Sequence, residues 1–255
     1  MLKIIKYVLH DILRNRVLIA YVLLLLVSSN GMFLINDDST KGLSSLLTIL
    51  LIVIPLVSIL FTTIYFFNSH EFIELLVAQP LRRKKILLGV YSGVACSLLT
   101  AFLVGIGISV VIFDATATGW YLIFAGSMLT LAFVSLGFLA SVITRDKTRG
   151  VGIALMLWFY FALIFDGILL IVLFTFSDYP LEKATIVMSC LNPIDLARIL
   201  VLLKMDISAL MGYTGAVFTQ FFGSGLGIIL SVSVLAAWVV IPLLLALRAF
   251  DKKNL

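Results

Sequence analysis

Six apolar runs, each about as long as a bilayer is thick, leave few folds open to this chain. They cover residues 17–35, 43–67, 86–113, 120–143, 151–176 and 224–247. About 20 apolar residues in a helix cross the ~30 Å hydrocarbon core of a bilayer. Only 12% of the residues are charged, against about 25% in a soluble domain. We therefore expect an all-α integral membrane protein with six transmembrane helices in a single domain, residues 1–255.

Positive charge collects at alternate ends of these runs. Of the 18 Lys and Arg residues, 14 lie before the first run or in the connections after the second, fourth and sixth runs. Cytoplasmic connections carry such an excess, so we expect both termini in the cytoplasm. Because the basic residues flank apolar runs, the net charge of +5 does not indicate a nucleic-acid partner.

Residues 1–16 have a helical charge pattern. Lys3, Lys6, His10 and Arg14 follow one another at three- and four-residue spacing and share one side of a helix. Apolar residues occupy the opposite side. This pattern predicts an amphipathic helix lying in the cytoplasmic membrane interface; a frayed basic tail is the alternative.

Residues 68–85, between the second and third runs, form an acidic segment followed by a basic one. Asn68 and Glu71 have the spacing of a capping box, and Pro80 disfavours helix at Gln79. We expect a short helix between them, with Glu71 and Glu74 on one side.

The same segment has two interpretations. A cytoplasmic helix presenting its acidic and apolar side chains could insert into a groove of a partner protein and transmit motion to the second and third spans. Alternatively, it is a solvated loop whose basic end only sets the topology. The residues concerned are Glu71, Phe72, Glu74, Leu75, Leu76, Arg82, Arg83, Lys84 and Lys85.

The outer connection, residues 177–223, contains a helix start. Asn192 suits an N-cap, Pro193 suits the first helical position and Asp195 suits the first turn. We expect a helix over residues 193–203, lying on the outer leaflet or across the mouth of the protein.

Asp166 lies about ten residues from the outer end of the apolar fifth run. A carboxylate at membrane depth costs roughly 2.5–3.5 kcal/mol on insertion scales, so it should face protein or water. It is either a cation or proton contact on a translocation path or dimer axis, or a hydrogen-bonded carboxyl that packs spans together.

Catalytic motifs are missing from the sequence. No GxxxxGK[ST], HExxH or GxSxG pattern occurs, so we expect a non-enzyme that takes energy from a partner. The sulfur atoms of Met188 and Cys190, on the outer side, are weak candidate ligands for a soft metal such as copper. Methionine also fills irregular apolar gaps, and we expect Cys96 to be a small buried apolar residue.

Three motifs carry a family resemblance. They are Glu71…Leu75-Leu76…Pro80-Leu81…Arg83 with Leu87-Leu88-Gly89, then Phe165-Asp166…Leu169-Leu170, and then Leu191-Asn192-Pro193-Ile194-Asp195…Arg198. Over its full length the chain resembles ABC-2 type transporter permeases. Among these it is most similar to the NosY-type permeases of the NosDFY transporters, which serve nitrous oxide reductase maturation.

The resemblance implies a homodimer in a bacterial inner membrane, driven by a NosF-like cytoplasmic ATPase dimer that binds ATP and Mg. It also implies a NosD-like periplasmic copper-handling partner, and contact with the ATPase through Glu71, Phe72, Glu74, Leu75, Arg82 and Arg83. The outer helix with Asn192, Pro193, Asp195 and Arg198 would face the periplasm. This chain itself would bind no cofactor. A generic ABC-2 exporter of a small or lipid-like substrate, and a mechanotransmitting membrane scaffold that moves no cargo, remain alternatives.

Overall fold

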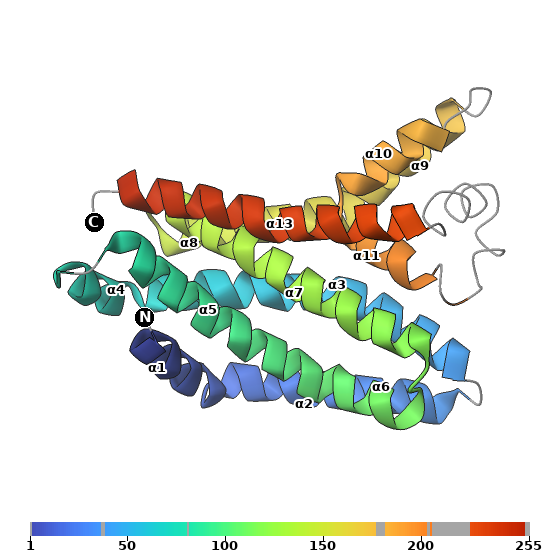
Figure 1. Cartoon of the computed structure of the whole chain (residues 1–255), viewed down its shortest axis with the longest axis horizontal. Helices are drawn as coiled ribbons and strands as arrows, with labels where there is room; N and C mark the ends of the chain where they lie inside the picture. The colour runs from blue at the N-terminus through green and yellow to red at the C-terminus, as the bar shows by residue number, and fades with distance from the viewer. Residues whose placement is uncertain are drawn as a thin grey trace.

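Every regular element in the described part of the computed structural model is helical (Figure 1). The structure describes residues 2–36, 39–80, 82–176, 182–202, 205 and 225–252. Within these ranges six stretches are long and apolar enough to cross a membrane: Arg16–Ile35, Thr40–Asn68, Arg83–Phe113, Ala117–Ile143, Lys147–Thr175 and Gly227–Lys252. The expected all-α membrane architecture with six spans is confirmed.

Four spans are single helices and two are interrupted. The single helices are α2 (Arg16–Ile35), α3 (Ser39–Asn68), α7 (Ala117–Ile143) and α13 (Gly225–Lys252). The third span consists of α5 (Arg83–Phe102), the π-helix η1 (Leu103–Gly107) and α6 (Ile108–Phe113). The fifth consists of α8 (Lys147–Phe159), the π-helix η2 (Tyr160–Ile164) and α9 (Phe165–Thr175). The shorter helices are α1 (Leu2–Leu13), α4 (His70–Val77), α10 (Glu182–Cys190) and α11 (Pro193–Leu202).

The two ends of the bundle differ in charge. The N-terminus, α4 and the end of α13 lie together at one end (Figure 1). The basic residues that begin α5 and α8 and follow α13's apolar stretch lie there too, so we call it the basic end. The end of α2, the start of α3 and α11 lie at the opposite end, which we call the far end.

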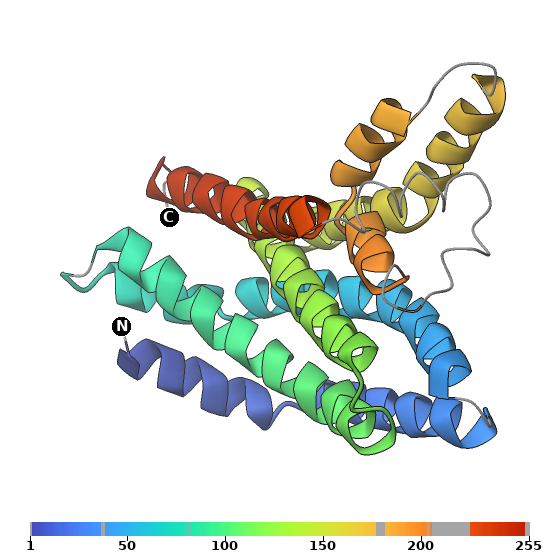
Figure 2. The same ribbon diagram turned by 45° about the vertical axis from the view of Figure 1, so that its right-hand side comes forward.

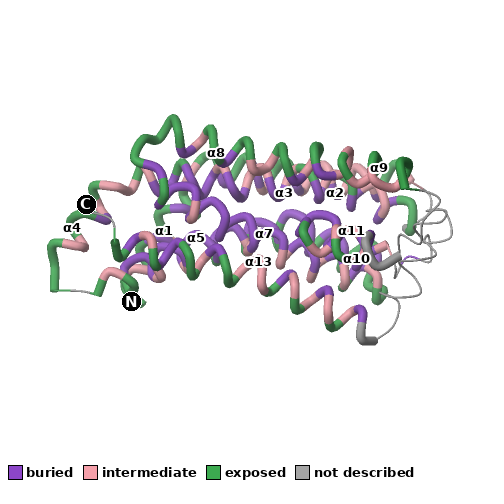
Figure 3. The backbone as a smooth tube through the Cα atoms, turned by 90° about the horizontal axis from the view of Figure 1, so that it is seen from above, coloured by how far each residue is buried: buried purple, intermediate pink, exposed green. Residues whose placement is uncertain are grey.

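Helix α7 is the centre of the bundle. In its most apolar stretch 67% of the residues are buried, against 11% for the fifth span. It packs against α3, α5, α11 and α13, and Figure 3 shows buried backbone along α7 and α3 and exposed backbone along α8 and α9. The fifth span therefore lies at the edge of a single copy of the chain.

Helix α1 packs along the first half of α5, and its apolar side is covered there by protein. Val8 and Ile12 are fully buried. A Cβ atom at Gly93 would lie 2.5 Å from Cγ1 of Val8, so only glycine allows this approach. Gly89 meets Ile4 one turn earlier. The spacing is that of small residues at helix contacts in membranes. The amphipathic helix predicted here is present, and its apolar side is partly used for packing on α5.

The fifth span bends outward at η2. Beyond it, α9 and α10 leave the bundle together as an antiparallel pair, most clearly in Figure 2. Helix α11 then returns to the bundle and packs on α7 and α13. A π-helix adds a residue to one turn and is a common cause of bends. The hydropathy of the sequence predicts this span, since residues 151–176 are apolar throughout, but it does not predict the bend.

Two local predictions are wrong. Asn68 does not cap the acidic helix, because α3 continues to Asn68 and the cap position is Ser69, which makes no capping side-chain hydrogen bond. Cys96 is exposed on the outside of α5, whereas the sequence suggested burial. A hydrophobic residue on a lipid-facing side follows the same apolar pattern as a buried one, and so the sequence does not separate the two.

Candidate functional site

Helix α4 is held against the basic end of the bundle by two side chains. Ile73 is buried, and Phe72 stacks on Tyr7 of α1, with ring centroids 4.9 Å apart. Such a stacked pair contributes about 0.5–1.5 kcal/mol beyond its burial. Phe72 therefore fixes α4 to α1. The sequence had suggested instead that Phe72 is presented to a partner protein together with Glu71 and Glu74.

The opposite side of α4 is open. Glu71 and Glu74 are exposed, and the side chain of Leu75 is 68% exposed. His70 Nδ1 lies 3.1 Å from Glu74 Oε1, one turn apart on the helix. Leu75 and its neighbour Leu76 differ in environment, because Leu76 packs against the hydrophobic core. This acidic side with one apolar projection, which we call the α4 face, has the chemistry to meet a basic groove on another protein.

The residues around α4 connect several spans. Lys84 Nζ lies 3.1 Å from Asp251 Oδ2, and Arg83 Nη1 donates to the Asp251 carbonyl at 3.5 Å, so the start of α5 is tied to the end of α13. Lys147 Nζ donates to Asn68 Oδ1 at 2.8 Å, which ties α8 to the end of α3. Arg82 is the exposed N-cap residue of α5. A force on α4 thus reaches α3 and α5 through the chain, and α8 and α13 through these contacts.

A second group of polar residues lies at the far end. Arg198 on α11 donates through Nη2 to Asp166 Oδ2 on α9 at 3.0 Å. Its Nη1 lies 3.2 Å from Asp195 Oδ1, one turn earlier on α11. The guanidinium therefore bridges two carboxylates from different segments. We call Asp166, Asp195 and Arg198 the outer cluster. Asp166 meets a cation from the protein, in agreement with the expectation that it faces away from lipid.

Asp195 is the most buried member of the outer cluster. Its side chain is 8% exposed, and its Oδ2 has no hydrogen-bond partner in the described part of the chain. Burial, together with the negative charge of Asp166, raises the pKa of Asp195 from 3.8 to about 7, although Arg198 opposes the rise. Asp195 therefore keeps its proton to a higher pH than an exposed aspartate does.

Asn192 fastens the bend of the fifth span. Its Oδ1 accepts a hydrogen bond from the Ile194 N–H at 3.0 Å, which caps α11. Its Nδ2 donates to the Phe161 carbonyl in η2 at 2.9 Å. Both contacts are buried, and Pro193 beside it is buried as well. A π-turn disturbs the regular i to i+4 bonding, and Asn192 supplies a partner to one of its carbonyls from another segment.

The two weak sulfur candidates lie on α10. Met188 and Cys190 are half-buried on α10, and burial raises the pKa of the Cys190 thiol, which favours its uncharged form. No group of three or more His, Cys, Asp or Glu residues among the described residues could hold a metal ion.

Comparison with known proteins gives the family. A model of the ABC-2 family transporter proteins matches residues 35–255, most of the chain. The chain belongs to the ABC-2 transporter family. A probable ABC transporter permease protein NosY of Pseudomonas aeruginosa is 31% identical over 228 residues, which cover 80% of this chain and 82% of the relative. Its namesake in Stutzerimonas stutzeri is 26% identical over 268 residues, covering 96% and 95%.

The chain is therefore an ABC transporter permease subunit and a multi-pass membrane protein. The residues singled out from sequence fall into two groups, the α4 face at the basic end and the outer cluster with Asn192 at the far end. Sequence reasoning missed Tyr7, Lys147 and Asp251, which support α4 or join its neighbours. It also missed the two π-helices. The Gly89 and Gly93 spacing was the available signal for the docking of α1.

Proposed function

We propose that a separate cytoplasmic ATPase dimer, NosF-like and using ATP and Mg, drives this permease through the α4 face. The observation that carries the proposal is the position of α4 between the second and third spans, with Glu71, Glu74 and Leu75 exposed. Its other side is fixed to α1 and the core through Phe72 and Ile73. A helix free on both sides would absorb motion, whereas a supported one transmits it.

The charge distribution supports an orientation. The basic end holds both termini and the exposed α4 face (Figure 1). Lys and Arg collect on the cytoplasmic side of membrane proteins. We infer that the basic end faces the cytoplasm of a bacterium, that the membrane is the inner membrane, and that the far end faces the periplasm.

We further propose that the chain works as a homodimer in a NosDFY-like complex that supports copper-site maturation of nitrous oxide reductase. The support is its similarity to two NosY proteins over most of both chains. A NosD-like periplasmic partner would meet the far end, where α9, α10 and α11 project (Figure 2).

One observation favours transmission of force over a conduit for cargo. Asp166, the acid expected at membrane depth, is neutralised by Arg198. The buried Thr63, Ser97, Thr130 and Ser141 each donate to a carbonyl of their own helix. These groups are already paired within the protein and are not available to coordinate a cargo. Four other buried hydroxyls, those of Tyr21, Ser29, Ser58 and Thr62, have no hydrogen-bond partner among the described residues. A mechanotransmitting scaffold is therefore the second candidate function.

Reversal of charge on the α4 face tests the ATPase contact. The double variant Glu71→Lys/Glu74→Lys, co-expressed with the cognate ATPase, is expected to lose co-purification and to lower ATP turnover of the reconstituted complex at least tenfold, because close interfacial charge pairs are worth about 1.5–7 kcal/mol. Expression level and gel-filtration profile should match the wild type.

A closely matched control is available at the same end. Glu74 and Asp146 are both exposed, with side-chain exposures of 51% and 62%, and each pairs with a basic residue of its own helix terminus. Asp146→Lys should leave the ATPase bound, whereas Glu74→Lys alone should weaken it. Wild-type turnover and co-purification in the double variant, or equal losses in the two single variants, would contradict the proposed contact.

A further inference from the structure

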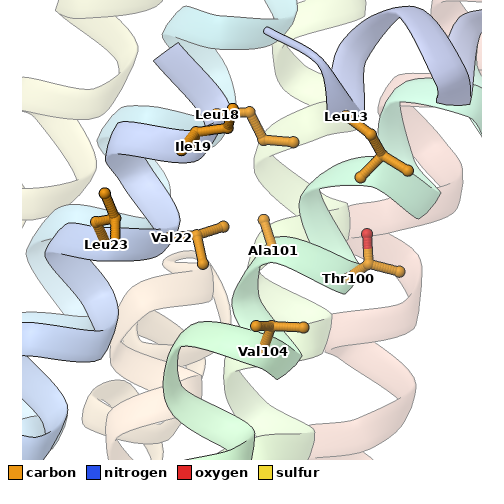
Figure 4. A pocket seen from close by; sticks show the side chains of 8 residues that line it. All are labelled: Leu13, Leu18, Ile19, Val22, Leu23, Thr100, Ala101 and Val104. Atoms are coloured by element: carbon orange, nitrogen blue, oxygen red, sulfur yellow. The ribbon is translucent and has the colours of Figure 1, made fainter. Parts of the chain in front are cut away.

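Two grooves flank the junction of α1 and α2, and they differ in chemistry. The first lies between α2 and α5, has a volume of about 270 Å³ and is drawn in Figure 4. Among the residues that line it are Leu18, Val22, Ala101, Val104 and the polar Thr100. The Thr100 hydroxyl donates a hydrogen bond to the Ser97 carbonyl at 2.8 Å. Its polar group is satisfied within the protein, so this groove offers only apolar contact.

The second groove lies between the junction and α3, and we call it the elbow groove. Its volume is about 340 Å³. The polar lining residues are Asn15, Tyr65 and Asn68, and apolar ones include Leu56, Val57 and Leu60. These polar residues all lie toward the basic end, where α3 stops at Asn68 and α2 begins. The groove is therefore polar at its basic end and apolar toward the middle of the membrane.

The length and direction of the elbow groove suit a lipid. From Asn68 to Leu56 is twelve residues, or about 18 Å of helix at 1.5 Å per residue. That distance runs from the membrane surface more than halfway through the ~30 Å hydrocarbon core. An acyl chain lying along Leu56, Val57 and Leu60 would place its headgroup beside Asn15 and Asn68.

Basic residues adjoin the polar lining residues of the elbow groove. Arg14 and Arg16 are exposed on either side of Asn15, and neither forms an ion pair with another described residue. Lys147 adds a third cation through its 2.8 Å hydrogen bond to Asn68 Oδ1. An acid lies here too, since Asp11 Oδ2 accepts a hydrogen bond from the Tyr65 hydroxyl at 3.2 Å. The exposed Arg14 and Arg16, which no described acid pairs with, favour an anionic headgroup.

Two further features point the same way. Asn15 Oδ1 accepts the Val17 N–H at 2.8 Å, so its Nδ2 hydrogens are the groups left to donate to a ligand. The N-terminus of the 20-residue helix α2 also begins here, and a helix N-terminus favours a negative charge. We propose that the elbow groove binds one acyl chain of an anionic phospholipid, with its phosphate held beside Asn15 by Arg14 and Arg16.

The bound lipid has a structural consequence. It would lie between the junction that follows α1 and helix α3, and α1 carries Tyr7, which stacks on Phe72 of α4. A lipid in the elbow groove therefore braces the support of the α4 face. This inference concerns binding alone and does not depend on the ATPase contact proposed above.

The headgroup part of the site is tested by native mass spectrometry of the full-length permease, released from nanodiscs that contain equal amounts of phosphatidylglycerol and phosphatidylcholine with identical chains. The wild type should retain phosphatidylglycerol in preference to phosphatidylcholine. Arg14→Gln/Arg16→Gln should reduce that preference roughly thirtyfold, since each basic residue at a membrane surface contributes about fivefold (~1 kcal/mol).

The matched control removes the same charge from the adjoining helix α1. Lys3 and Lys6 are exposed on α1, two to three turns from the junction. Lys3→Gln/Lys6→Gln should keep the preference of the wild type. An equal loss in both double variants would show diffuse attraction to the membrane surface and would overturn the site, as would an unchanged preference in Arg14→Gln/Arg16→Gln.

The acyl-chain part is tested by filling each groove in turn. Val57→Trp should abolish retention of phosphatidylglycerol, whereas Val104→Trp in the other groove should not. Leu60→Phe, a smaller change, serves if Val57→Trp does not fold. Retention in both filled variants of the elbow groove overturns the proposal. Loss of a dimer without loss of lipid also overturns it, because the occupant would then be a second copy of the chain.

Discussion

Replacement of Asp195 by asparagine tests the chemistry of the outer cluster. Asparagine has nearly the shape of the protonated carboxyl, and its neutral amide does not titrate between pH 6 and pH 8. In the native protein burial and the neighbouring Asp166 raise the pKa of Asp195 from 3.8 to about 7. A raised pKa of an acid means that the folded state holds a proton that the unfolded state releases. The stabilisation from that proton is complete below about pH 3.8 and is lost as the pH rises through about 7.

The size of the effect follows from the two pKa values. Proton linkage with a native pKa of about 7 gives a loss in the free energy of unfolding of roughly 1–2 kcal/mol between pH 6 and pH 8. For a chain of 150–250 residues, each kcal/mol shifts the melting temperature by roughly 2–4 °C. The wild type should therefore melt roughly 3–6 °C lower at pH 8 than at pH 6 through this group alone.

The assay is thermal unfolding followed by tryptophan fluorescence, for which the chain has three tryptophans. Because other groups can also respond to pH in this range, we compare the fall in melting temperature between pH 6 and pH 8 in each variant with the fall in the wild type. Asp195→Asn should reduce the fall in melting temperature by roughly 3–6 °C, while Asp146→Asn, a change at an exposed acid of the other end, should not. An identical pH response in wild type and Asp195→Asn would refute the reasoning.

Three further substitutions test the packing. Asn192→Ala removes the cap of α11 and leaves the buried Phe161 carbonyl without its partner, and should cost about 2–4 kcal/mol in thermal unfolding. Gly93→Ala places a Cβ atom 2.5 Å from Val8 and should cost about 1–3 kcal/mol, measured in the same way. Tyr7→Ala removes the aromatic contact under α4 and should increase the mobility of a spin label on that helix, seen as a narrower spectrum.

Each of these has an internal check. Asn192→Ser, which keeps a capping oxygen but not the amide donor, should recover the smaller part of the loss. Gly152→Ala, where a Cβ atom meets nothing within 4 Å, should leave stability unchanged. Tyr7→Phe keeps the stacked ring and should leave the label as it is in the wild type. Losses as large in these controls as in the test variants would show that the named contacts are not the cause.

The sequence predicts the spans well because each one obeys a simple rule. An apolar run must form a helix in lipid, since every backbone group needs a partner there. The start of α11 follows from Asn192 and Pro193 for an equally local reason. The hydropathy of α8 and α9 says nothing about the π-turn between them, because one extra residue in a turn does not alter composition.

The two candidate sites were predictable in different degrees. Glu71 and Glu74 stand out from the sequence because charged residues are rare in this chain. The sequence did not distinguish the covered apolar residue of α4 from the exposed one, since Phe72 and Leu75 are both apolar and only the position of Tyr7 decides which of them is covered. Asp166 and Arg198 are 32 residues apart in sequence. Their pairing depends on the return path of α10 and α11, which no local pattern contains.

The π-turn η2 determines the direction in which the residues after it point. Each residue of an α-helix turns the chain by about 100°, so one residue fewer within Tyr160–Ile164 would rotate Asp166 by about that angle relative to α8. The carboxylate would then turn away from Arg198, and an acid would be left in the span without its cation. A deletion of one residue here would consequently do more harm than most substitutions of the residues themselves.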